Sequence, residues 1–347
     1  MAEFAHLSEV DPEIAPHLEA LRASTMRPDV PIDKVREALK AGVMETVKAK
    51  YQPLLPTESD YTIADHSIEV GDGVKALSRI VTPAPRDGED GTFPVLFWMH
   101  GGGFALGDVN TDDYRLRIAS VRLRLSIVNF EYRLAPENPF PAAVDDAFAG
   151  LKYVASHPET FSASLHKGFL VGGTSAGANL AAVLSHLARD DPFFDDKPLT
   201  GQLLHIPSVI HYQAPVPEKY KSSLLSLEQN KDAPLLGKAQ IIHFMEMYKA
   251  TPTDTRSSPL LLDSHKGLPP AYLQICGLDP LRDGGLLYRK VLGEAGVPTK
   301  LDVYPGVPHN FESRFFDIKQ AVKSREDFHV GLEWLLRGEK DVQVKDL

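Results

Sequence analysis

Short apolar runs that alternate with helical stretches are the feature that most limits how this chain can fold. Six such runs follow one another between residues 94 and 304, and helical patterns lie between most of them. Strands that are apolar on both faces occur in parallel sheets, where connecting helices cover each side. We therefore expect strands at 94–99, 126–132, 168–172, 202–206, 271–276 and 300–304. The helical patterns lie at about 112–123, 141–156, 176–190, 283–295 and 322–337.

A hairpin precedes these runs and completes the predicted sheet. Residues 61–70 and 74–82 are β-like, and Gly71-Asp72-Gly73 between them is typical of a tight turn. Two antiparallel strands followed by six more make eight. The sequence therefore predicts an α/β protein with an eight-stranded, mostly parallel sheet and helices on both faces.

Two segments contain no strand pattern and are expected to form a helical cap over the sheet. In the first, apolar residues recur every four positions from Val35 to Val47, which predicts one apolar face on a helix that begins near Pro31. The second connects two strands and is long enough to expect a functional role. Its apolar patch at 241–247 is equally compatible with a plain helix core. The predicted organisation is a cap segment at 1–60, core at 61–208, a cap insertion at 209–257, core at 258–338 and a polar tail at 339–347.

The composition excludes several kinds of partner and environment. The formal net charge is −10, so no basic surface is expected to neutralise nucleic-acid phosphates or anionic lipid. No run of about 18 apolar residues is present, and the N-terminus does not have the pattern of a secretory signal. Cys276 is the single cysteine, so no disulfide can form within the chain. We expect a cytoplasmic protein with no nucleic-acid partner and no transmembrane segment, and a homodimer is left open.

A candidate nucleophile follows the predicted strand at 168–172. Gly173-Thr174-Ser175-Ala176-Gly177 has the form G-x-S-x-G, and a helical pattern begins directly after it. A serine on such a strand–turn–helix projects its hydroxyl from the sheet edge, and the flanking glycines remove Cβ atoms that would clash. The motif alone is weak, because ordinary composition produces it in about one chain in ten of this length. An ordinary serine in a glycine-rich turn is the alternative.

A second glycine-rich segment is much rarer. His100-Gly101-Gly102-Gly103-Phe104 follows the strand at 94–99. Successive glycines expose backbone N–H groups and allow a reacting carbonyl to approach closely, as an oxyanion hole requires. A flexible hairpin is the alternative, and the spacing does not match a dinucleotide-binding loop.

An acid and a base complete the candidate triad. Asp279 and His309 each follow the end of a predicted strand, which is the sheet edge where open α/β sheets place their sites. The chain order Ser175, Asp279, His309 is that of the α/β hydrolases. His309 would accept the serine proton, and Asp279 would fix the histidine tautomer and stabilise the imidazolium. Asp283 is a rival acid, although a helix cap or loop support is the favoured interpretation of that residue.

With these motifs in place, the chain resembles the hormone-sensitive-lipase family of α/β-hydrolase esterases over roughly residues 60–336. The resemblance rests on His100-Gly101-Gly102-Gly103, Tyr132-Arg133-Leu134-Ala135-Pro136-Glu137, Gly173 to Gly177, Asp279-Pro280-Leu281 and His309. It implies the α/β-hydrolase fold, hydrolysis of carboxylic esters without metal or cofactor, and the two cap segments above the pocket. It also implies that the oxyanion donors are the N–H groups of Gly102, Gly103 and Ala176. Thr174 and Ala178 depart from the residues that many relatives carry, and they change the local hydrogen bonding of the turn.

The predicted function is a serine carboxylesterase that acts on small to medium carboxylic esters through an acyl-enzyme on Ser175. Phe104, His205, Phe244 and Met245 are the candidate substrate contacts, and His205 has no metal-ligand spacing around it. A lactonase, amidase, thioester hydrolase or lyase on the same triad is the first alternative, because the fold does not specify the reaction. A non-catalytic ligand-binding relative is the second, and the presence of His309 argues against it.

Overall fold

The structure is a computed structural model, and it describes residues 3–338 apart from the side chains of residues 43 and 44. The predicted polar tail at 339–347 lies outside the described residues.

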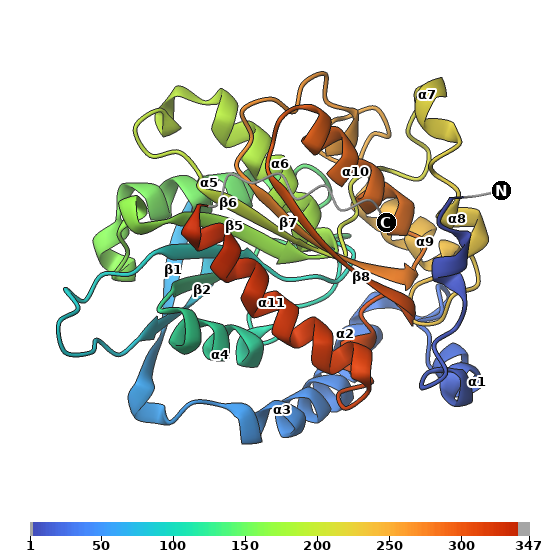
Figure 1. The fold of residues 1–347 in the computed structure, drawn as a ribbon, viewed down its shortest axis with the longest axis horizontal. Coiled ribbons are helices and arrows are strands. Elements are labelled where there is room, and N and C mark those ends of the chain that lie inside the picture. Colours follow the sequence, from blue (N-terminus) through green and yellow to red (C-terminus); the bar gives the residue numbers. More distant parts are fainter. Residues whose placement is uncertain (1–2, 339–347) are drawn as a thin grey trace.

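One sheet forms the centre of the molecule (Figure 1), and its strand order is β1-β2-β4-β3-β5-β6-β7-β8. The first two strands pair antiparallel, β2 pairs antiparallel with β4, and all later pairings are parallel. This confirms the predicted eight-stranded, mostly parallel sheet. The strands are β1 (Tyr61–Gly71), β2 (Val74–Pro83), β3 (Val95–Met99), β4 (Ser126–Phe130), β5 (Phe169–Thr174), β6 (Gly201–His205), β7 (Ala271–Leu278) and β8 (Thr299–Pro308).

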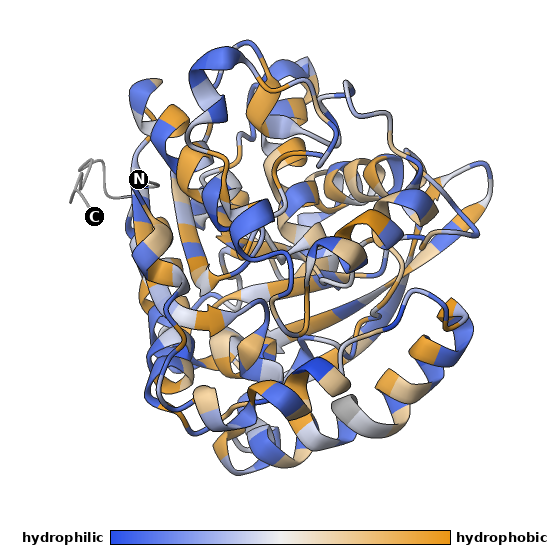
Figure 2. Cartoon of the chain, turned by 90° about the vertical axis from the view of Figure 1, so that its right-hand side faces the viewer, coloured by the Kyte–Doolittle hydropathy of each residue, from blue (hydrophilic) through white to orange (hydrophobic). Residues whose placement is uncertain are grey.

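Helices cover both faces of the sheet because the central strands are apolar on both sides (Figure 1). Along β3, Leu96 and Trp98 join the core beneath α4 and α11, while Phe97 and its alternate neighbours join the core beneath α5, α6 and α10. Surface helices carry both hydrophobic and hydrophilic residues, as one-sided packing requires (Figure 2). These helices are α4 (Asp113–Leu123), α5 (Ala142–Ser156), α6 (Ala176–Asp190), α10 (Arg282–Glu294) and α11 (Lys319–Arg337).

The last two strands extend beyond their predicted ends. The pairing of β7 with β8 shifts register after Cys276 and then continues to Leu278 and Pro308. Gly306, at φ +70°, lies close to the backbone of Glu9 and Val10, where a Cβ atom would collide. Because the two strands continue to Leu278 and Pro308, Asp279 and His309 come directly after the ends of β7 and β8, without an intervening loop.

The N-terminal segment and the 209–257 insertion are helical, but the helix expected from Pro31 is not continuous. A π-helical turn at Leu39–Met44 separates α2 (Ile32–Ala38) from α3 (Glu45–Tyr51). Val35 and Leu39 pack in one apolar cluster with Ile241 and Phe244, so the two distant segments meet. The remaining α-helices are α1 (Leu18–Ala23), α7 (Glu218–Lys221), α8 (Ser226–Gln229) and α9 (Lys238–Tyr248). Short 3-10 turns occupy Ala5–Ser8, Ala15–His17, Gln52–Leu54, Glu58–Asp60, Pro158–Phe161, Leu165–Lys167, Pro192–Phe194, Pro259–Leu261 and Phe311–Ser313.

Within residues 3–338, no helix combines the length and the apolar character needed to cross a bilayer.

Candidate active site

Ser175 occupies a strained turn between β5 and α6. Its backbone has φ +56° and ψ −109°, and its N–H donates to the carbonyl of His205 at 2.8 Å. A Cβ atom on Gly177 would lie 2.1 Å from the carbonyl oxygen of Met99, and one on Gly173 would lie 2.4 Å from the backbone of Gly177. Both flanking glycines are therefore required by close packing of the turn against the end of β3.

Three strand ends bring the predicted triad residues together. His309 Nε2 lies 2.9 Å from Ser175 Oγ, and His309 Nδ1 lies 2.6 Å from Asp279 Oδ2. Because a carboxylate accepts hydrogen bonds, Nδ1 carries the proton, which leaves the Nε2 lone pair free to accept from the serine hydroxyl. Asp279 is only 1% exposed, and its second oxygen accepts from the N–H of Leu281 at 2.8 Å. The arrangement can polarise the hydroxyl of Ser175 for attack on a carbonyl carbon.

The rival acid, Asp283, is used elsewhere. Its carboxylate accepts from the backbone N–H groups of Leu225 and Ser226 at 2.8 and 2.7 Å, and from Arg282 Nε at 2.8 Å. The residue at the N-terminal cap of α10 is Leu281, and it makes no side-chain cap bond. The sequence favoured either a helix cap or loop support for Asp283. In the structure, its carboxylate supports the loop.

The glycine loop after β3 lies against the same cavity as the triad. Gly102 and Gly103 have φ +124° and +60°, and a Cβ atom on Gly102 would lie 2.2 Å from the carbonyl oxygen of Leu106. The hydroxyl of Tyr132 donates to the carbonyl of His100 at 2.8 Å and the two rings stack, which holds the start of the loop. Gly102, Gly103 and Ala176 all line the cavity that contains Ser175 and His309. The positive φ values and the close approach of Leu106 and Phe244 leave no room for a side chain at Gly102 or Gly103.

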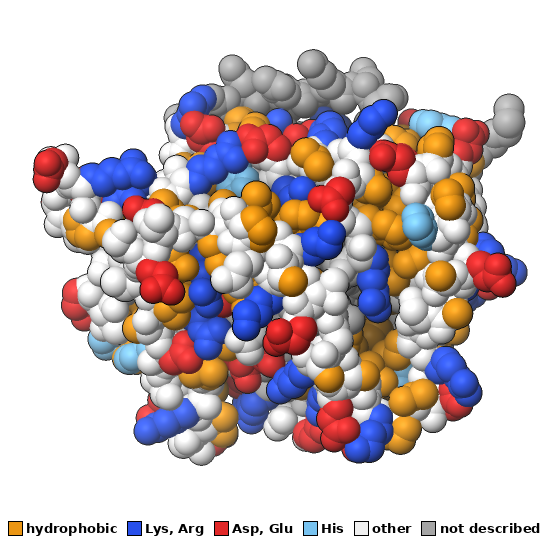
Figure 3. Space-filling view, turned by 90° about the horizontal axis from the view of Figure 1, so that it is seen from below, with side chains coloured by type: hydrophobic (Ala, Val, Ile, Leu, Met, Phe, Trp, Pro, Cys, Tyr) orange, Lys and Arg blue, Asp and Glu red, His pale blue; other side chains and the backbone are white. Residues whose placement is uncertain are grey.

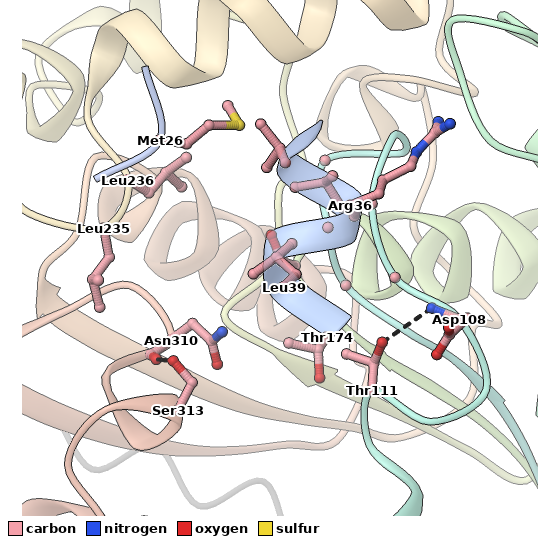
Figure 4. Close-up of a pocket in the computed structure, with 18 of the residues that line it drawn as sticks. Met26, Arg36, Leu39, Asp108, Thr111, Thr174, Leu235, Leu236, Asn310 and Ser313 are labelled. Atoms are coloured by element: carbon pink, nitrogen blue, oxygen red, sulfur yellow. Dashed lines mark hydrogen bonds between the residues drawn. The ribbon is translucent and has the colours of Figure 1, made fainter. Parts of the chain in front are cut away.

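A cavity of about 1180 Å³ opens beside Ser175 and is apolar on one side and polar on the other. The view from below in Figure 3 shows a hollow with hydrophobic side chains in its depth and basic side chains at its border. In Figure 4, Met26, Leu235 and Leu236 lie on one side of α2, and Thr111, Thr174 and Asn310 lie below it. The apolar lining residues include Met26, Val30, Val35, Leu39, Phe104, Leu106, Leu235, Leu236, Ile241, Phe244, Met245 and Leu281. The polar lining residues include Asp108, Asn110, Thr111, Asp112, Arg115, Glu131, Thr174, Asn310 and Glu312.

Three of the four predicted substrate contacts reach this cavity. Phe104, Phe244 and Met245 line it, whereas His205 is not among its lining residues. The ring of His205 is 2% exposed, and it contacts Thr174 Oγ1 at 3.3 Å and Glu312 at 3.7 Å instead. Position at a strand end was therefore a poor guide to the direction of this side chain.

Sequence reasoning also missed a group of buried charges beside the triad. Arg115 and Glu312 both line the cavity, and their side chains are 8% and 9% exposed. The only local signal was that Glu312 follows His309 by three residues. Within residues 3–338, no group of three or more His, Cys, Asp or Glu side chains is arranged to hold a metal ion.

Known proteins resemble this chain along most of its length. Residues 96–313 match the family described as "alpha/beta hydrolase fold". An AB hydrolase superfamily protein of Schizosaccharomyces pombe is 35% identical over 330 residues, which cover 95% of this chain and 94% of that protein. Versiconal hemiacetal acetate esterase of Dothistroma septosporum is 35% identical over 258 residues, which cover 72% of this chain and 75% of that enzyme.

A solved structure is also similar to this chain. Vibralactone cyclase superposes with a TM-score of 0.90 and 40% identity, and the match covers 96% of each chain. The chain therefore belongs to the α/β hydrolases, and within them to the hormone-sensitive-lipase type that its motifs had indicated.

Proposed function

We propose that this protein is a serine carboxylesterase that hydrolyses small to medium carboxylic esters through an acyl-enzyme on Ser175. The observation that carries the proposal is the unbroken hydrogen-bonded chain from Ser175 Oγ through His309 to Asp279, beside a largely apolar cavity. Similarity to an enzyme named as an acetate esterase supports the same class of reaction.

In the first half of the reaction, Ser175 Oγ attacks the ester carbonyl and its proton passes to His309 Nε2. The N–H groups of Gly102, Gly103 and Ala176 would stabilise the negative oxygen that develops on the substrate. His309 then donates its proton to the leaving alcohol as the carbon–oxygen bond breaks. The acyl group is left as an ester on Ser175.

In the second half, water attacks the acyl carbon while His309 Nε2 accepts a proton from it. The bond to Ser175 Oγ breaks, and His309 returns the proton to that oxygen. Asp279 holds the imidazole and offsets its positive charge in both halves, because its carboxylate lies 2.6 Å from Nδ1. Each step needs only nucleophilic attack, proton transfer and hydrogen bonding, which this chain's own residues and water would supply, so we propose that no metal or cofactor takes part.

We also propose that residues 1–60 and 209–257 form a cap that selects substrates, over a core made of 61–208 and 258–338. Support comes from the cavity lining, to which α2 contributes Val35 and Leu39 and the insertion contributes Leu236 and Phe244. Apolar walls of this kind favour esters with an apolar acyl or alcohol group.

A second candidate function is lactone chemistry on the same triad. The specific observation is the 40% identity to vibralactone cyclase over 96% of each chain. A lactone is an internal ester, so the same acyl-enzyme could be opened by water or closed by a hydroxyl of the acyl group itself. Incubation with a linear hydroxy-ester, followed by mass spectrometry, separates the two outcomes. Free hydroxy-acid supports the esterase, and lactone product supports the cyclising reaction.

The expected setting of the reaction follows from charge and cysteine content. A net charge of −10 and one cysteine support a cytoplasmic protein that acts on small molecules rather than nucleic acid. Tagged protein in cell fractions tests the location. Light scattering of the purified protein decides whether it forms the homodimer that the sequence leaves open.

The decisive experiment for the proposed function is Ser175→Ala. This variant should fold normally, lose nearly all ester turnover and no longer react with a fluorophosphonate, because no other group would form the acyl-enzyme. Ser67→Ala is the matched control, since Ser67 is exposed on β1 and does not line the cavity. Labelling of another serine, or turnover by Ser175→Ala within about tenfold of the natural protein, would contradict the assignment.

A further inference from the structure

Four buried polar side chains form a closed ring between the loops that carry Ser175 and His309. Arg115 Nη2 donates to Thr174 Oγ1 at 3.1 Å, and Thr174 Oγ1 lies 3.3 Å from His205 Nδ1. His205 Nε2 lies 3.7 Å from Glu312 Oε1, and Glu312 Oε2 lies 3.7 Å from Arg115 Nη1. None of these side chains takes part in the steps proposed above, so the ring calls for a separate explanation.

Three members of the ring, Thr174, His205 and Glu312, are linked to residues of the triad through the backbone. Thr174 directly precedes Ser175, and the carbonyl of His205 accepts the N–H of Ser175 at 2.8 Å. Glu312 lies three residues after His309, in the 3-10 turn Phe311–Ser313. The ring therefore joins the turn of the nucleophile to the loop of the base by contacts that bypass the Ser175–His309 hydrogen bond itself.

Arg115 is the fixed point of the ring. Its guanidinium donates to Asp112 at 2.7 Å and lies over the rings of Trp98 and Phe328, at 5.5 and 4.6 Å from their centroids. Phe328 is on α11 and Trp98 is on β3, so the arginine is held by the main body of the domain. A planar guanidinium in such a slot has little rotational freedom, which suits a reference point better than a flexible lysine would.

Arg115 and Glu312 remain charged in this setting. Burial alone would raise the pKa of Glu312, but its contact with His205 and the charge of Arg115 lower it to about 2. Burial opposes the charge of Arg115, but the carboxylates of Asp112 and Glu312 raise its pKa. Burial lowers the pKa of His205, which favours a neutral imidazole beside the ion pair of Arg115 and Glu312.

Stability does not account well for this ion pair. Removing two charges from water costs nearly as much as their attraction returns, and apolar replacements of buried pairs are often neutral or stabilising. Geometry is a better explanation, because displacement of a catalytic group by about 1 Å can cost about 10²-fold in rate. We propose that Arg115 and Glu312 are positioning residues, which set the loop of His309 at the correct distance from Ser175. This inference rests on the proposed function.

Two variants test the proposal. Glu312→Gln keeps the size of the side chain and removes the ion pair, and Arg115→Lys keeps the positive charge but cannot reach Asp112, Thr174 and Glu312 together. Both should lower kcat by at least about tenfold while KM stays within about twofold, because alignment for attack is lost and the apolar wall of the cavity is unchanged. The rate of fluorophosphonate labelling of Ser175 should fall by a similar factor, since it depends on the same alignment.

Asp146→Asn is the matched control. Asp146 is 0% exposed and binds Arg133 through several hydrogen bonds, and neither residue lines the cavity. This control should lower the melting temperature without changing kcat for each titrated active site. A folded Glu312→Gln or Arg115→Lys protein with kcat and labelling rate within about twofold of the natural protein would overturn the proposal.

Other results separate this proposal from the proposed function. If Glu312→Gln does not fold, Arg115→Lys tests the proposal by itself. That variant retains a cation beside the carboxylates of Asp112 and Glu312. Absence of labelling at Ser175 in the natural protein would defeat the esterase assignment and the positioning role with it. Normal labelling and turnover in the natural protein, together with unaffected ring variants, would defeat the positioning role alone.

Discussion

Replacement of Asp279 by Asn tests the acid of the triad with almost no change in shape. Asp279 accepts from His309 Nδ1 at 2.6 Å through one oxygen and from the N–H of Leu281 at 2.8 Å through the other. If the amide oxygen of an asparagine stays with Leu281, its NH₂ group faces Nδ1. Two donors cannot pair, so the imidazole moves its proton to Nε2 and can no longer accept the proton of Ser175.

The expected loss combines the wrong tautomer with an imidazolium that has no nearby negative charge. A hydrogen bond to a charged group contributes about 1.5–3 kcal/mol, and the equivalent change in a serine protease lowers kcat by about 10⁴. We expect kcat to fall by about 10² to 10⁴, which corresponds to about 3 to 5 kcal/mol in the barrier. Because Asp279 is 1% exposed and shape is conserved, the fold should persist.

Asp283→Asn is the control, since Asp283 supports the loop at Leu225 and Ser226 rather than His309. It should weaken folding by about 1–3 kcal/mol, because one buried acceptor and the partner of Arg282 are altered. Its kcat for each titrated site should stay within about tenfold of the natural value. The assay is steady-state ester turnover after circular dichroism and urea unfolding. A folded Asp279→Asn protein within about tenfold of natural activity, or an inactive but folded Asp283→Asn protein, would refute the assignment.

Three further predictions concern the cavity and the buried histidines. A Cβ atom on Gly103 would lie 2.4 Å from the ring of Phe244, so Gly103→Ala should lower kcat at least about tenfold, and Phe244→Ala in the same chain should restore part of it. If stopped-flow turnover shows that the losses of the two single variants simply add in the double variant, this prediction is wrong. Phe244→Ala and Met245→Ala should each shift the preferred p-nitrophenyl ester toward longer chains, and an unchanged profile would make this wall purely structural. Burial lowers the pKa of His186 to about 3 and of His329 to about 4. Below about pH 6.5 the unfolded chain therefore binds more protons, and the free energy of unfolding should fall by up to about 1.4 kcal/mol per pH unit for each histidine. Urea unfolding at pH 7 and 5 measures this slope, and His329→Leu should make it shallower.

Local pattern was sufficient for the sheet and for the order of the triad. Near-continuous apolar runs predicted the strands because central strands are buried on both faces, as β3 to β6 are here. The helix after Ser175 was predicted at its observed bounds, Ala176–Asp190. Residues directly after strands were the natural places for Asp279 and His309, since the ends of parallel strands meet at one edge.

Other features depend on contacts between distant parts of the chain. The sequence at Gly277, Pro305 and Gly306 suggests the ends of strands, yet pairing between β7 and β8 carries both strands through these residues. His205 stands at a strand end like the triad residues, and only packing against Thr174 and Glu312 decides that its ring does not line the cavity.

There is a physical reason why the sequence predicts some of these features and only the tertiary structure shows the others. Strand, turn and helix preferences depend on neighbours a few residues away, so the sequence by itself determined the elements, the candidate nucleophile and the sheet edge that carries the chemistry. Arg115 and Glu312 are 197 positions apart in numbering, and no local period relates them. Only the tertiary structure decided that these charges meet, that α2 and α9 enclose one cavity, and how the loops of Ser175 and His309 are held together.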